Sequence, residues 1–191
     1  MDASEAREHL ELVERIIAQS AQRLHVGAEF FLVWGLFGAT CDGLFTAAES
    51  GSISTGVTLV AYAVLLLAAV AFSVLRARYY RECGERMSLL QREYLNVLWL
   101  TIALATVATF TTFNIFSSVV ARGSLWSFAE AIVLFYVGMH GNRRAQIGGI
   151  VILASLIAAN FVPFPGAGWI LAAGVLLGYA GFGAAELIAR E

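Results

Sequence analysis

This chain contains six long apolar runs. Its arginines are concentrated before the first run, after the last run and in alternate gaps between the runs. We expect the runs to form helices over residues 27–48, 55–75, 94–116, 125–140, 146–162 and 169–188. About 20 helical residues cross the hydrocarbon core of a membrane, so each run is near spanning length. Lipid offers no partner to unpaired backbone groups, so such runs must be helical. The sequence therefore predicts an all-α integral membrane protein, a six-helix bundle made of three hairpins.

The arginines also predict an orientation. If the runs alternate across a membrane, all but one of the twelve basic residues fall on one side, and only Arg122 falls on the other. An excess of basic residues in short loops marks the cytoplasmic side. We therefore expect a protein of the cytoplasmic (bacterial inner) membrane with both termini in the cytoplasm.

The composition argues against a soluble domain and against a nucleic-acid-binding protein. Apolar residues make up 59% of the chain and charged residues 14%, against about 25% charged residues in soluble domains. A soluble domain of this composition would expose large apolar patches. The net charge of −2 and the lack of a basic stripe argue against a nucleic-acid partner. The expected surroundings are the lipid bilayer.

The segment before the first run has a different character. Residues 1–24 are expected to form an amphipathic cytoplasmic helix, followed by a six-span transmembrane domain over residues 25–191. This arm carries five acidic residues and three arginines, so it is not a polybasic lipid-binding helix. It either lies on the cytoplasmic face of the bundle or docks onto another protein or a second copy. Residues 2–24 and the arginine-rich residues 76–93 are the candidate contact segments.

The sixth run carries a stripe of small residues. Gly174, Gly178 and Gly181 fall on one face of an ideal helix. The spacing Gly174-x-x-x-Gly178 lets a neighbouring backbone approach closely. The stripe predicts packing inside the bundle or, alternatively, a homo-oligomer contact through the sixth helix.

Polar residues interrupt four of the runs at a similar expected depth near the outer side. They are Asp42, Asn114, Glu130 and Asn160. Ionisable groups inside a membrane are costly and are functional candidates by default. The four side chains are therefore a candidate ligand-binding pocket open to the outside. The alternative is that each one bonds to its own backbone or reaches the membrane surface.

A second polar group is expected at the cytoplasmic side. It comprises His25, Glu29, His140 and Glu186, at the level of Arg143, Arg144 and Arg190. Ion pairing accounts for it, since no pair has the spacing of a helical metal site. No nucleophile elbow, phosphate-binding loop or zinc-protease motif occurs in the sequence. We therefore expect no metal, no cofactor and no enzyme activity.

The start of the chain resembles a group of small bacterial multi-span membrane proteins of uncharacterised function. The resemblance lies in Leu12-Val-Glu14-Arg-Ile with Ser20 and Arg23, then in Phe30-Phe-Leu-Val-Trp34-Gly35. It implies an N-terminal amphipathic helix and no activity or site residues. The six-helix layout is also similar to the substrate-binding subunits of energy-coupling-factor vitamin transporters, which bind a solute from the outer face. The long acidic arm departs from those subunits.

Two functions follow as hypotheses. The first is a non-enzymatic membrane protein that acts through assembly, as an accessory, scaffold or signalling subunit. The arm, the arginine-rich segment and the absence of catalytic motifs favour it. The second is a small-solute binding or transport protein that uses the outer polar residues. Whether Asp42, Asn114, Glu130 and Asn160 share one site decides between them.

Overall fold

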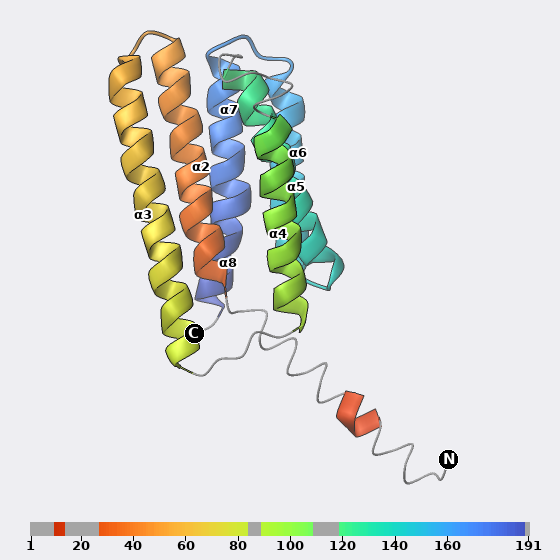
Figure 1. Ribbon diagram of the computed structural model, residues 1–191. Helices are drawn as coiled ribbons and strands as arrows, with labels where there is room; N and C mark the ends of the chain where they lie inside the picture. The colour runs from red at the N-terminus through yellow and green to blue at the C-terminus, as the bar shows by residue number, and fades with distance from the viewer. Residues whose placement is uncertain (1–9, 14–26, 84–88, 109–118, 190–191) are drawn as a thin grey trace.

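The computed structural model describes residues 10–13, 27–83, 89–108 and 119–189, and Figure 1 shows the helices standing side by side in one bundle. The part of the chain that is described contains no strand, so the prediction of an all-helical protein is confirmed. The helices are α2 (Ala28–Glu49), α3 (Thr55–Glu82), α4 (Leu89–Ala108), α5 (Val119–Met139), α6 (Arg143–Ala159), α7 (Gly166–Val175) and α8 (Gly181–Ile188), with the π-helical turn η2 (Leu176–Ala180) joining the last two.

Four helices are long and apolar enough to cross a membrane. They are Ala28–Glu49, Thr55–Glu82, Val120–Met139 and Gly166–Ile188. The last of these consists of α7, η2 and α8 in one continuous rod, which we call the last helix. Among the described residues, the apolar part of α4 is Asn96–Ala108 and α6 has 17 residues, so neither reaches the length of the other four. The described helices therefore support a membrane protein without establishing six spans.

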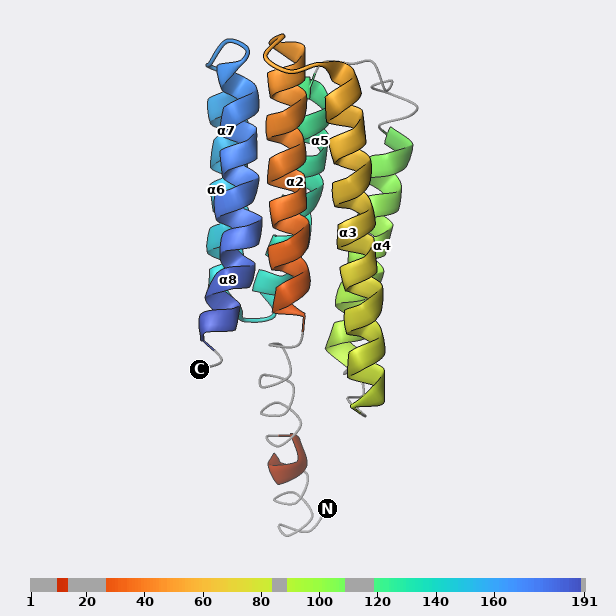
Figure 2. The ribbon, with the colours of Figure 1, turned by 90° about the vertical axis from the view of Figure 1, so that its left-hand side faces the viewer.

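The last helix lies at the centre of the bundle. It contacts α2 and α6 along most of its length and also contacts α5. Helix α3 packs on the outside of α2, and α4 packs on the outside of α5 (Figures 1 and 2). A Cβ at Gly35 of α2 would collide with the backbone of Ala180, and one at Gly183 would collide with the backbone of Leu32. Small residues thus allow α2 and the last helix to touch backbone to backbone.

Caps at the expected turns define the hairpins. The Ser54 side chain accepts a hydrogen bond from the Val57 N–H at 3.3 Å, and the Asn142 side chain accepts one from the Ala145 N–H at 3.1 Å. These bonds satisfy amides that have no partner in the first turn of a helix. Gly141 has φ +96°, a conformation that only glycine adopts readily. The turns after α2 and α5 therefore lie where the polar breaks in the sequence predict them.

One helix boundary differs from the expectation. The described part of α5 begins at Val119, ahead of the span expected from residue 125, whereas the second helix continues beyond its apolar run to Glu82, as the break expected near Gly84 implies. Hydropathy marks where the apolar run ends, whereas Arg122 and Ser124 contain nothing that stops a helix. The longer α5 moves Glu130 to about three turns from the helix start, near its middle, and not one turn as expected.

Several predictions fall on parts of the chain that are not described. The amphipathic arm lies outside the described residues except for one helical turn at residues 10–13. Asn114, His25, Arg190 and the side chains of most residues between 84 and 92 also lie outside them. The arm and these side chains stay as predicted from the sequence.

Candidate functional site

Asp42 and Glu130 lie across the contact between α2 and α5, and each carboxyl group faces a glycine of the opposite helix. A Cβ at Gly123 of α5 would lie 3.3 Å from Oδ1 of Asp42, and a Cβ at Gly38 of α2 would lie 3.0 Å from Oε1 of Glu130. The two carboxyl groups therefore occupy space that only glycine leaves free. We call Asp42, Glu130, Gly38 and Gly123 the carboxyl–glycine site.

The last helix closes this site with apolar side chains. The Cβ at Gly38 would also lie 3.3 Å from Cγ1 of Val175, and the Cβ at Gly123 would lie 3.2 Å from Cδ1 of Leu171. Leu171 and Val175 are fully buried. The site is consequently a closely packed junction of three helices, in which Asp42 and Glu130 are half-buried and a charge is less well solvated than at the surface.

The two carboxyl groups differ in their surroundings. Arg122 lies close enough to Asp42 for their opposite charges to attract, and its guanidinium also stands 5.6 Å from the centre of the Phe45 ring. The charge that acts on Glu130 is that of Asp42, which has the same sign. Oε2 of Glu130 is buried and accepts no hydrogen bond within the part of the chain that the structure describes. Such a group costs free energy unless a partner arrives.

The structure places Asn160 outside this site. Asn160 caps the end of α6, where its Nδ2 donates a hydrogen bond to the carbonyl of Leu156 at 2.8 Å, and its side chain is exposed. Asn114 lies outside the described residues. The described part of the predicted pocket is thus a pair, Asp42 and Glu130.

The glycine stripe of the last helix is split between two faces. A Cβ at Gly178 would lie 2.5 Å from Cγ1 of Ile152 and 2.6 Å from the carbonyl oxygen of Gly148, both on α6. A Cβ at Gly174 would collide with Ser155 of α6, whereas one at Gly181 would meet only the Leu176 carbonyl at 3.7 Å. The π-helical turn η2 precedes Gly181. It changes the rotation per residue, so the ideal wheel places Gly181 wrongly.

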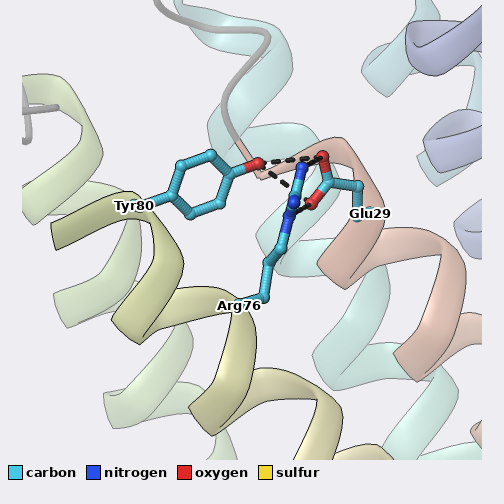
Figure 3. A network of polar contacts seen from close by, with 3 residues as sticks. All are labelled: Glu29, Arg76 and Tyr80. Atoms are coloured by element: carbon cyan, nitrogen blue, oxygen red, sulfur yellow. Dashed lines mark hydrogen bonds and ion pairs between the residues drawn. The ribbon is translucent and has the colours of Figure 1, made fainter. Parts of the chain in front are cut away.

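At the cytoplasmic end, Glu29 joins α2 to α3 through the network shown in Figure 3. Nε of Arg76 lies 2.6 Å from Oε2 of Glu29, and Nη2 lies 2.8 Å from Oε1, which makes a bidentate ion pair. The Tyr80 hydroxyl lies within hydrogen-bond distance of both oxygens, at 2.8 and 2.9 Å. Glu29, a member of the predicted cytoplasmic group, thus pairs with Arg76, an arginine that the sequence analysis did not place with it.

The rest of the predicted cytoplasmic group divides in two. Nη1 of Arg144 lies 3.3 Å from Oε1 of Glu186, which joins α6 to α8. His140 packs against Tyr94 and Tyr136, with ring centres 5.5 and 5.0 Å away. Within the described ranges no three His, Cys, Asp or Glu side chains are grouped as metal ligands.

Sequence reasoning missed the glycines of the carboxyl–glycine site. Gly38 lies four residues before Asp42, and Gly123 lies seven before Glu130, so each shares a helix face with a carboxyl group. A glycine at helical spacing from an intramembrane acid is therefore a usable signal.

No family model matches the chain, and no curated protein or solved structure matches it either.

Proposed function

We propose that this chain is an integral protein of the cytoplasmic membrane that binds a small cation at Asp42 and Glu130, as part of solute binding or transport and without catalysing a reaction. One observation carries the proposal: the buried Oε2 of Glu130 has no hydrogen-bond partner among the described residues, in a site that already holds a second carboxyl group. A positive ligand would supply the missing partner and offset the repulsion of the two acids. An intramembrane acid that only packs is normally paired.

The proposed orientation places both termini in the cytoplasm. The C-terminal end of α3, which carries Arg76, Arg78 and Arg81, and the start of α6 lie at the same end of the bundle, opposite the start of α5 (Figure 1). The positive-inside rule assigns the arginine-rich end to the cytoplasm. Asp42 is about two turns from the outer end of α2, so a cation would approach from outside.

Cysteine labelling tests this orientation. Ser52 lies in the exposed turn after α2, and Cys83 is exposed at the end of α3. In intact cells, a membrane-impermeant maleimide is expected to label Ser52→Cys and to leave Cys83 unlabelled until the cells are opened. The buried Cys41 serves as the internal negative control. Labelling of Cys83 in intact cells would contradict the orientation.

The cation site is tested by thermal stability. We expect at least one member of a panel of cations (protons, sodium, potassium, ammonium and choline) to raise the melting temperature of the detergent-solubilised protein at constant ionic strength. A ligand that binds only the folded state stabilises it by mass action. Glu130→Gln keeps the shape of the side chain and should abolish this response, whereas Glu82→Gln, an exposed change on α3, should preserve it. A wild-type response that Glu130→Gln leaves intact would contradict the proposal.

Assembly is the second candidate function. Helices α3 and α4 lie on the flanks of the bundle, and much of their apolar surface is uncovered, with Val60 66%, Leu67 69% and Trp99 66% exposed. Such apolar helix faces can contact lipid, and they can equally bind a neighbouring membrane protein or a second copy of the chain. This candidate predicts contacts through α3, α4 or the arm, and it leaves the buried acids without a role.

A further inference from the structure

Ser127 of α5 differs from six other buried or half-buried serine and threonine side chains of the helices. Thr46, Thr58, Ser73, Thr101 and Thr106 each donate to the carbonyl four residues earlier, and Ser155 donates to the carbonyl three residues earlier. Ser127 is 0% exposed, and its Oγ has no hydrogen-bond partner among the described residues. A buried hydroxyl without a partner costs free energy. The lone pairs and the proton of the Ser127 hydroxyl therefore form no hydrogen bond with the described residues.

Ser127 lies on the face of α5 that forms the carboxyl–glycine site. It follows Gly123 by four residues and precedes Glu130 by three, so the three positions fall within about 60° on the helix. Side chains three residues apart on a helix are neighbours. Ser127 and Glu130 thus share one face of α5 with Gly123, which the carboxyl group of Asp42 faces.

The packing limits the size of the ligand. Even a single methyl group at Gly38 or Gly123 would press on Val175, Leu171 or a carboxyl oxygen, at 3.0 to 3.3 Å. An organic cation has several carbon atoms and would have to displace these buried side chains. A bare ion is smaller and would require less displacement, and a proton would require none.

The charged side chains around the site limit the charge of the cation that it can bind. Arg122 attracts Asp42 and offsets one negative charge. When Glu130 is ionised it contributes a second negative charge, and one further positive charge then makes the region neutral. A divalent ion would leave an uncompensated positive charge in a closely packed site.

We propose that the cation of this site is a dehydrated sodium ion held by oxygen atoms of Asp42, Ser127 and Glu130. This inference rests on the proposed cation-binding function. Alkali and other hard cations take oxygen ligands, and a binding site replaces the water of hydration with them. A hydroxyl oxygen with free lone pairs is suited to such a ligand. A proton needs only the carboxyl groups, so the part played by Ser127 distinguishes the two ligands.

Sodium titrations of the melting temperature, at fixed pH and with choline chloride keeping the ionic strength constant, test the inference. The pH is fixed because Arg122, Tyr179 and Cys41 also lie near the carboxyl pair. We expect sodium to raise the melting temperature of the wild type more than potassium or choline does. Ser127→Ala should raise the sodium concentration needed for half of this effect by about tenfold, the loss of about 1.4 kcal/mol.

Ser155→Ala is the matched control, because it removes a hydroxyl that already bonds to the Ile152 carbonyl. It should keep the wild-type sodium response. Ser127→Cys keeps the volume of the side chain but offers sulfur in place of oxygen, so it should also weaken the response if Ser127→Ala does not fold. Equal sodium affinity in the wild type and in a folded Ser127 variant would overturn the role of Ser127.

The outcomes also separate this inference from the proposed function. If protons or an organic cation stabilise the wild type through Glu130 and sodium does not, the sodium site is wrong and cation binding stands. If no cation acts through Glu130, both fail.

Discussion

Gly178→Leu is expected to disrupt the packing of the last helix against α6. A Cβ at Gly178 would lie 2.5 Å from Cγ1 of Ile152 and 2.6 Å from the carbonyl oxygen of Gly148. The carbonyl belongs to the backbone of α6, so it cannot rotate away as a side chain can. Overpacking costs about 1–3 kcal/mol when side chains can adjust and more when they cannot. We expect a loss of about 3 kcal/mol or more, measured as a lower melting temperature and an aggregated fraction in gel filtration.

Gly181→Leu is the matched control on the same helix. A Cβ there meets only the Leu176 carbonyl, at 3.7 Å. Leucine also has a higher helix propensity than glycine, by roughly 1 kcal/mol. The Gly181 variant should therefore keep or raise the melting temperature. Equal damage from the two substitutions would mean that the close contact between α6 and the last helix is not what holds them together.

Arg76→Gln is expected to destabilise the cytoplasmic end of the α2–α3 pair. The change removes the bidentate ion pair with Glu29, a side chain that is only 14% exposed. It also removes the guanidinium that stacks 4.7 Å from the centre of the Tyr80 ring. Hydrogen bonds to charged groups contribute about 1.5–3 kcal/mol. We expect a loss of that size in the free energy of unfolding, measured by chemical denaturation in detergent.

Arg78→Gln, two residues further along α3, provides the comparison. Its side chain is exposed, and an exposed arginine contributes about 0–1 kcal/mol. Both variants lose one positive charge at the same end of the bundle, so a difference between them reports the Glu29 contact. If both lowered the stability equally, the effect would come from net charge alone.

Hydropathy together with polar, glycine and proline residues predicted three of the turns between the described helices. The apolar runs are interrupted at residues 50–54, 141–142 and 160–165, and helices end there. The start of α5 was missed because Arg122 and Ser124 lower the hydropathy without stopping the helix. This error placed Glu130 about one turn from the start of its helix, whereas the structure places it near the middle of α5.

The site was predicted in part. Asp42 and Glu130 were selected because acids are expensive in a membrane, and the structure puts them on facing helices. Their partners could not be found in this way, because glycines and a serine are ordinary in apolar helices. An ideal helical wheel assumes 100° per residue and does not include the π-helical turn η2. It therefore grouped Gly181 with Gly174 and Gly178, although Gly181 faces another direction.

The position of the last helix has a consequence for the order of assembly. It follows α2, α5 and α6 in the chain, yet it lies between them and supplies Leu171 and Val175 over the two acids. Chains are synthesised from the N-terminus, and membrane helices insert before they associate. If the helices insert in this order, Asp42 and Glu130 precede their apolar cover. The glycines of the opposite helices then leave room for the carboxyl groups before Leu171 and Val175 arrive, so we expect the α2–α5 contact to form before the last helix packs.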